Sequence, residues 1–431
     1  MKKKYLLIFG LIYPSLLLSQ PIQHQKDGEK FRVGLYALQD GNNSSISGII
    51  NQVMDAHEGV TSNQYEAANI VIPYRTWIRG TYPNFDLNEW FGDYMEEIYE
   101  ETQHDGLAFL QTISVPLYTQ FVDPPFDTSA TSIAQIGNDK GTNRTLNTAL
   151  FDNFINEILQ REFDIVHTAV NGDENLIRSI LGNKDDRPLG GWYLDDEPLV
   201  RNHDTQVINQ MGSRIRTLEN NFRNNNAVLS QLNTNQYQQK RYIAFDANDL
   251  HDHYSSTRKL DGDIYNENGT TNSISSSNKY SIFGSNVDVL MPDFYNHNHQ
   301  FWHIIIQQIR REYELNSLPI PEIIPIIQGF KNDYSSWFSE VEYTRLRDEL
   351  IKDDVDGIFL YVWPNKENNN YFGTRGLWDD GFSNIGRVLE GIESFNTSIA
   401  KDDLALLYNQ NSNAQRTLVL LSDGDSFRDK N

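Results

Sequence analysis

The chain has no cysteine, so it can form neither a disulfide bond nor a site built on thiolate ligands. It is also poor in positive charge, because 36 lysines and arginines stand against 59 aspartates and glutamates, for a net charge of -23. Such a charge repels nucleic acid and anionic membranes, so the sequence predicts neither as a partner. Gly-x-Ser-x-Gly is absent, and no Gly-x-Gly-x-x-Gly opens a helix after the first predicted strand. Serine-hydrolase chemistry and a nucleotide-binding fold therefore have little support.

The N-terminus has the order of residues that is typical of a secretory signal peptide. Three lysines at positions 2–4 precede an apolar stretch over residues 5–18, which then gives way to polar residues. A membrane-spanning helix needs roughly 20 apolar residues, and Pro14 interrupts this stretch. We therefore expect a signal peptide over residues 1–20, a secreted or periplasmic protein, and no membrane anchor.

Short apolar runs bounded by polar turn residues recur along the rest of the chain. Near-continuous apolar runs suit parallel strands that are buried on both faces. The predicted strands cover residues 31–38, 70–74, 107–113, 191–194, 242–245, 287–291, 323–327 and 358–362. Helical periodicity is found over residues 87–102, 150–163, 205–222, 301–313, 343–352 and 382–395.

Strands that alternate with helices predict an α/β fold, a (β/α)8 TIM barrel, whose active site lies at the carboxyl ends of the strands. The competing fold is a doubly wound open sheet. Long loops follow the third strand, over residues 114–146, and the fifth strand, over residues 246–285, and we expect both on the active face. The barrel is expected to span residues 30–400, with an appendix or tail over residues 401–431. The oligomeric state stays open.

The fourth predicted strand ends in three acids and a proline, Asp195-Asp196-Glu197-Pro198. Adjacent carboxyls repel one another and cost desolvation, which a folded chain normally avoids unless it uses their chemistry. The same repulsion raises the pKa of a carboxyl, and a general acid must stay protonated near neutral pH. Glu197 is therefore the leading catalytic candidate. The alternative is a polar turn or a cap on the next helix.

Polar and aromatic residues also follow the other predicted strands, and in a barrel they converge on one site. Aromatic faces beside carboxylates suit a sugar ring, whose C–H face stacks while its hydroxyls form hydrogen bonds. The catalytic candidates beside Glu197 are Asp195, Asp293 and Tyr295. The substrate-binding candidates are Arg75, Trp77, Trp192, Asp246, Gln328 and Trp363.

Cleavage of a glycosidic bond needs a proton donor for the leaving oxygen and a second group that stabilises or attacks the sugar cation. The run Trp192–Pro198 resembles barrel glycoside hydrolases of clan A, in which an acid/base glutamate follows strand four in an Asn-Glu-Pro motif. Asp196 stands in place of that asparagine. In that clan a nucleophilic glutamate ends strand seven, but here the strand ends at Gln328 and Glu322 lies at its other end.

A second resemblance rests on Asp195-x-Glu197, on the run Met291–Tyr295 and on Trp363, which are similar to the strand ends of chitinase-like barrels. Those enzymes use the acetamido group of the substrate as the nucleophile. The resemblance implies that Glu197 is the acid, that Asp195 orients the acetamido group, and that Tyr295 hydrogen-bonds it. It also implies that Trp363 forms the floor of the pocket.

A third possibility follows from the residues alone: an inverting reaction in which Asp293 or Asp246 activates water. The sequence predicts no cofactor and no metal site. The acids and histidines over residues 246–253 lack the spacing of a calcium loop, and no glutamate completes a zinc motif over residues 297–303.

Together these residues predict an exported glycoside hydrolase that acts on a polysaccharide or another glycan, with carbohydrate as its partner. The rival hypothesis is a degenerate barrel that binds glycan without cleaving it.

Overall fold

A computed structural model describes most of the predicted strands and helices. The described residues are 31–38, 65–72, 86–104, 110–126, 144–184, 186–198, 203–246, 281–293, 299–328, 330–331, 346, 349–363 and 375–376. The chain divides into two compact units, residues 1–23 with 391–431 and residues 24–390, and all described residues belong to the second. The signal peptide, the tail and the boundaries at residues 30 and 400 lie outside the described residues and stay predictions.

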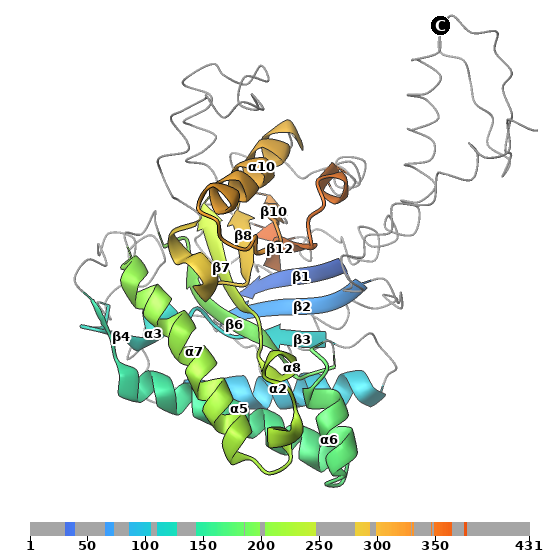
Figure 1. Cartoon of the computed structure of the whole chain (residues 1–431). Coiled ribbons are helices and arrows are strands. Elements are labelled where there is room, and N and C mark those ends of the chain that lie inside the picture. The colour runs from blue at the N-terminus through green and yellow to red at the C-terminus, as the bar shows by residue number, and fades with distance from the viewer. Residues whose placement is uncertain are drawn as a thin grey trace, which may run out of the picture. The chain divides into compact units, whose positions relative to one another are not determined.

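The main sheet contains nine strands, and every pairing within it is parallel (Figure 1). They are β1 (Phe31–Leu38), β2 (Tyr65–Ile72), β3 (Leu110–Ile113), β6 (Leu189–Asp196), β7 (Arg241–Asp246), β8 (Val289–Asp293), β9 (Glu322–Ile323), β10 (Ile326–Gln328) and β12 (Gly357–Trp363). Their order is β10-β12-β1-β2-β3-β6-β7-β8-β9. Strand β10 also pairs with β8 through Ile326 and Asp293, so the sheet curls back toward itself.

Each predicted strand overlaps an observed one, and the α/β class is confirmed. Residues 73–74 and 107–109 of the second and third predicted strands lie outside the described residues. Strand β2 begins at Tyr65 rather than at Ile70, because its first half is too polar to stand out as an apolar run. The predicted seventh strand is divided into β9 and β10, and Pro325 lies between them. Proline has no N–H to donate, so it interrupts the ladder at that point.

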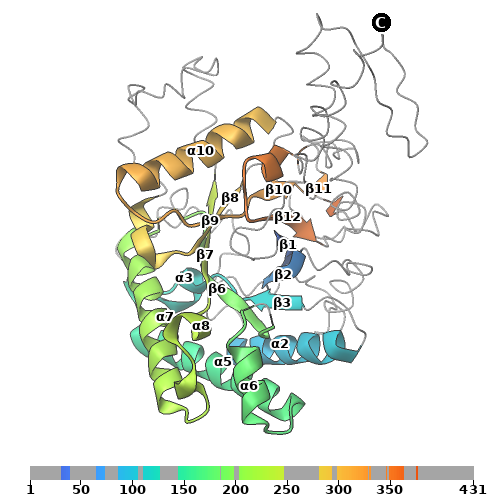
Figure 2. The same cartoon turned by 45° about the vertical axis from the view of Figure 1, so that its right-hand side comes forward.

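The long helices lie outside the curled sheet (Figures 1 and 2). They are α2 (Leu87–His104), α5 (Thr148–Ala169), α7 (Thr205–Asn225) and α10 (His299–Leu315). Each begins within two residues of its prediction, but α5 continues to Ala169 rather than ending at residue 163. The shorter helices α3 (Leu117–Phe121), α6 (Glu174–Leu181) and α8 (Thr234–Tyr237) had no predicted counterpart. The predicted helix over residues 382–395 lies outside the described residues. Across the described ranges, none of the helices is both long enough and apolar enough to span a membrane.

Residues 349–352, at the end of the predicted helix over residues 343–352, are helical. The described secondary structure also includes short antiparallel pairs and 3-10 turns. Strands β4 (Val122–Asp123) and β5 (Thr145–Leu146) pair within the long loop after β3. Strands β11 (Phe330–Lys331) and β13 (Arg375–Gly376) form a second pair. The 3-10 turns are η1 (Leu229–Gln231) and η3 (Ser281–Asn286).

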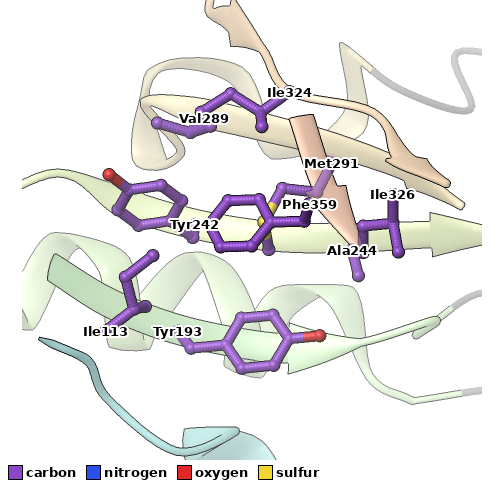
Figure 3. Packing of buried hydrophobic residues seen from close by; sticks show 9 residues of the cluster. All are labelled: Ile113, Tyr193, Tyr242, Ala244, Val289, Met291, Ile324, Ile326 and Phe359. Carbon is purple, nitrogen blue, oxygen red and sulfur yellow. The ribbon is translucent and has the colours of Figure 1, made fainter. Parts of the chain in front are cut away.

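The concave face of the sheet is filled by a cluster of buried side chains, which we call the concave cluster (Figure 3). Its members are Ile113, Tyr193, Tyr242, Ala244, Val289, Met291, Ile324, Ile326 and Phe359. They come from β3, β6, β7, β8, β10 and β12, and from Ile324 between β9 and β10. Because β10 pairs with both β8 and β12, these strands curl around the cluster. Figure 3 shows the hydroxyls of Tyr193 and Tyr242 pointing in opposite directions.

The packing of β6 against β7 leaves room only for a glycine at position 191. Gly191 has φ of 149°, and a Cβ at this position would lie 2.3 Å from the Tyr242 ring and 2.7 Å from the Lys240 carbonyl oxygen. We expect Gly191→Ala to lower the free energy of unfolding by about 2–4 kcal/mol, through both steric overlap and an unfavourable backbone conformation. Denaturant unfolding measures this loss. Gly284→Ala is the control, because Gly284 also has a positive φ, of 52°, but has open space around it.

The Gly284→Ala control isolates the cost of the backbone conformation, which is about 1–2 kcal/mol for a non-glycine residue. A Gly191→Ala variant that is no less stable than Gly284→Ala would contradict the close approach of the two strands.

Glu322 lies at the amino end of the strands, where it is held by two buried cations. The Lys240 Nζ atom is 2.6 Å from one carboxylate oxygen of Glu322, and the guanidinium of Arg32 donates to the other. Burial alone raises the pKa of Glu322, but the charges and hydrogen bonds of Arg32 and Lys240 outweigh it and lower the pKa below its usual value. This carboxylate therefore belongs to an ion network on the side of the sheet away from the strands' carboxyl ends.

A lowered pKa makes the contribution of Glu322 to stability depend on pH. The contribution is fully present above the unfolded-state pKa of about 4.3, and it is lost as the pH falls toward the lower folded-state pKa. We expect Glu322→Gln to lower the free energy of unfolding by about 1.5–3 kcal/mol at pH 7. The variant should also lose less stability than the parent between about pH 5 and pH 3.

Denaturant titrations at pH 7, 5 and 3 measure both effects. Glu314→Gln is the control, because Glu314 forms an exposed pair with Arg311. An equal acid-induced loss of stability in the parent and in Glu322→Gln would contradict the role given to this network.

Candidate active site

A β-bulge near the end of β6 decides which acids face the inside of the curl. The register between β6 and β7 shifts between Tyr193 and Asp195, which makes Leu194 the extra residue. Simple alternation from Tyr193, a member of the concave cluster, would place Asp195 on the concave face. Because of the bulge, Asp196 is instead in register with Ala244, another member of the cluster. The adjacent acids Asp195 and Asp196 therefore have different surroundings.

Asp195 is completely buried and forms a pair with His203. The Oδ2 atom of Asp195 is 2.6 Å from Nδ1 of His203. The other carboxylate oxygen, Oδ1, accepts a hydrogen bond of 2.8 Å from the backbone N–H of Asp196. The Asp195 carboxylate therefore stabilises the end of β6, in addition to any role toward a substrate.

Asp196 is linked to the concave cluster through Tyr193. The Tyr193 hydroxyl donates to Oδ1 of Asp196 over 2.8 Å, and both residues are buried. The backbone N–H of Tyr193 in turn donates to Oγ of Ser114, the first residue after β3, over 2.7 Å. Two hydrogen bonds therefore fix the end of β6: one between Tyr193 and Asp196 within the strand, and one to Ser114 after the neighbouring strand β3.

Glu197 follows these two acids and has the most exposed side chain of the three. Its backbone has φ of 50°, in the left-handed region. That conformation costs a non-glycine residue roughly 1–2 kcal/mol. The backbone N–H of Glu197 donates to the Ala244 carbonyl oxygen of β7 over 3.2 Å. Strained residues of this kind cluster at functional sites, where the surrounding structure maintains them.

Two further acids lie at the ends of the adjacent strands. Asp246 ends β7 and Asp293 ends β8, and the two are in register. Neighbouring strands are about 4.8 Å apart, so the two backbones approach closely. Asp293 is buried, and it continues the row of Val289 and Met291 on the concave face. The structure therefore brings Glu197, Asp246 and Asp293 to the carboxyl ends of three adjacent strands.

The other predicted site residues are only partly described. Gln328 ends β10 and Trp363 ends β12, as the sequence predicts. Arg75, Trp77 and Tyr295 lie outside the described residues, so their roles stay predictions.

Trp192 requires a correction, because its side chain packs outside the sheet. Its ring is completely buried, and Nε1 donates to Oε1 of Glu219 on α7 over 2.8 Å. Burial raises the pKa of Glu219, against the lowering effects of Arg216 and of the hydrogen bonds from Trp192 and the backbone N–H of Gln239. The structure thus assigns Trp192 to packing between β6 and α7 rather than to a sugar-binding surface.

Sequence reasoning missed His203 and its aromatic neighbours. The His203 ring stacks on Tyr118 of α3, with centroids 4.3 Å apart and an interplanar angle of 15°, and Phe126 packs against it at 5.4 Å. Burial raises the pKa of Tyr118 to about 12, so its hydroxyl stays protonated, and it accepts a hydrogen bond from the backbone N–H of Asp204. These residues carry no motif, and only their place in the loops after β3 and β6 marks them.

Chemically, the described part of the site offers carboxylates, a histidine and a tyrosine. Within the described ranges, no group of three or more histidines and acids could hold a metal ion. The acids and histidines over residues 246–253, which lack the spacing of a calcium loop, fall almost entirely outside those ranges.

Comparisons with known proteins give no family for the chain. No family model and no curated protein matches it. Among solved structures, it is similar to the catalytic domain of a hyperthermophilic chitinase from Pyrococcus furiosus, with a TM-score of 0.42 and 10% identity over 85% of this chain and 97% of that one. It is also similar to an endo-beta-1,4-mannanase from Thermotoga petrophila, with a TM-score of 0.41 and 11% identity over 86% of this chain and 78% of that one.

Proposed function

We propose that this protein is a glycoside hydrolase and that Glu197 is its general acid. The observation that carries the proposal is the left-handed backbone of Glu197 at the carboxyl end of β6. This conformation places a partly exposed carboxyl beside the buried acids Asp195 and Asp196. Acid catalysis of glycoside cleavage requires a carboxyl that can reach the glycosidic oxygen, and Glu197 is the partly exposed member of the three.

The proposal includes a closed (β/α)8 barrel, in which the strand ends surround one site. It is supported by the parallel pairing of β10 with both β12 and β8. In a closed barrel, Asp293 on β8 and Glu197 after β6 face a common centre at the active end.

In the proposed reaction, Glu197 gives its proton to the glycosidic oxygen as the bond from that oxygen to the anomeric carbon breaks. A second group then stabilises or attacks the sugar cation. Water supplies the hydroxyl of the product and gives its other proton to a carboxylate at the site, which restores the protonation that the next cycle needs. Asp293 is the described candidate for this group, and Asp246 is the alternative on β7. An acetamido group on the substrate, oriented with the help of Tyr295, is the third possibility.

The net charge of -23 favours neutral or cationic glycans over acidic ones. Export stays a prediction from residues 1–20. Arg75, Gln328, Trp77 and Trp363 are proposed to bind the sugar.

A screen of the purified protein against a panel of neutral and amino-sugar polysaccharides tests the proposal, with reducing ends counted over time. We expect new reducing ends from at least one member of the panel, and the anomer of the first product distinguishes retention from inversion. The rival hypothesis, a barrel that binds glycan without cleaving it, is favoured by the absence of a glutamate at the end of β10. Binding with no new reducing ends on any member of the panel would establish that rival.

A further inference from the structure

The turn Asp196–Pro198, which carries Glu197, has a backbone hydrogen bond at each of its three residues. The backbone N–H of Asp196 donates to the Asp195 side chain, and the backbone N–H of Glu197 donates to β7. The carbonyl oxygen of Pro198 accepts a hydrogen bond of 2.8 Å from the backbone N–H of His203. His203 therefore contacts the turn twice, through its backbone at Pro198 and through its ring at Asp195.

The His203 ring has a single hydrogen bond within the described structure. A carboxylate only accepts, so Nδ1 of His203 carries the proton that is donated to Asp195. The other nitrogen, Nε2, is buried and has no hydrogen-bond partner among the described residues. Packing against Tyr118 and Phe126 restricts the ring further. The bond to Asp195 is thus the polar interaction that orients the imidazole.

This arrangement connects the loop after β3 to the turn after β6. Tyr118 of α3 stacks on the His203 ring, and the ring is hydrogen-bonded to Asp195, which directly precedes Asp196 and Glu197. A rotation of the Asp195 carboxylate would release the backbone N–H of Asp196, next to Glu197. A displacement of about 1 Å at a reacting group can cost on the order of 10²-fold in rate.

We propose that His203 is a positioning residue for the general acid, acting through its Nδ1–H bond to Asp195. The inference rests on the proposed function and adds a residue and a mechanism to it. His203 does not touch the substrate in this account. It maintains the left-handed turn that presents Glu197.

Two substitutions separate the hydrogen bond from the packing. His203→Asn keeps a donor where Nδ1 lies but loses the stacked ring. His203→Phe keeps a ring between Tyr118 and Phe126 but loses the donor. We expect His203→Phe to lower kcat on the glycan found in the screen by about 10²-fold, with KM within about threefold of the parent. We expect His203→Asn to keep kcat within about fivefold of the parent.

His303→Ala is the matched control. His303 also pairs with an aspartate, Asp353, but it is exposed and lies on α10. Its removal should leave kcat and KM unchanged. Thermal unfolding of all three variants ensures that each assay is made on folded protein.

The reverse order, with His203→Asn impaired and His203→Phe active, would assign His203 to packing and overturn the inference. Equal losses in both variants, in proportion to their lost stability, would overturn it as well. A parent protein that cleaves no glycan would overturn the proposed function and this inference with it. That result is distinct from an active parent whose His203→Phe variant is equally active.

Discussion

Replacing Glu197 by glutamine is expected to slow glycan cleavage by roughly 10²- to 10⁴-fold, the usual contribution of general acid catalysis. Glutamine has nearly the same shape as glutamate but has no proton to give to the leaving oxygen. The side chain is partly exposed, so its replacement should leave the melting temperature nearly unchanged. Initial rates of reducing-end release, measured with the parent and the variant at equal concentration, give the ratio.

Glu157→Gln is the control for this substitution, because Glu157 lies on the exposed side of α5 and contacts Asn88. It should cleave as fast as the parent. A Glu197→Gln variant that retains more than about a tenth of the parent rate would remove Glu197 from the role of general acid.

The largest loss of stability is expected from breaking the ion pair between Arg187 and Glu162. Both side chains are almost completely inaccessible to solvent, and the guanidinium donates to both carboxylate oxygens. It also donates to the Tyr237 carbonyl oxygen and lies 4.6 Å from the centre of the Tyr237 ring. Burial lowers the pKa of Arg187, but Glu162 more than offsets this, so the pKa is raised and the guanidinium stays charged.

Arg187→Met should therefore lower the free energy of unfolding by about 3–5 kcal/mol, because it leaves a buried carboxylate without its cation. Arg161→Met is the matched control, because Arg161 pairs with Asp93 and Glu96 at the surface, where such pairs contribute about 0–1 kcal/mol. Denaturant unfolding measures both variants.

A double variant, Glu162→Met with Arg187→Met, refines this test. Replacing both charges by apolar side chains of similar size should recover much of the loss, because no buried charge is left unpaired. Equal stabilities of Arg187→Met and Arg161→Met would contradict the structural importance given to the buried pair.

The strands and long helices could be predicted because burial on both faces leaves apolar runs, and packing on one face leaves a helical period. The start of β2 could not, since Glu66 and Asn69 interrupt the apolar run. The division of β9 from β10 has a visible cause in Pro325, whose missing N–H breaks the ladder.

The surroundings of the acids at the candidate site could not be predicted from the sequence. The three acids after β6 are visible in the sequence, but the bulge at Leu194 is not, because an apolar residue there suits a regular strand equally well. The bulge places Asp196 in register with the concave cluster and leaves Asp195 paired with His203.

The wrong prediction for Trp192 could have been avoided from the alternation of side chains along a strand. Trp192 and Tyr193 are adjacent in a strand, so their side chains face opposite sides. Since Tyr193 lies in the concave cluster, Trp192 lies against the outer helices.

The central claim, that Glu197 supplies a proton to the leaving oxygen, is tested most directly by changing the leaving group. A dinitrophenyl glycoside of the sugar found in the screen has a leaving group so acidic that it departs without protonation. The account predicts that Glu197→Gln loses roughly 10²- to 10⁴-fold on the natural glycan but releases dinitrophenolate from the dinitrophenyl glycoside in the first turnover at nearly the parent rate. Equal losses on the two substrates, or no loss on either, would contradict it.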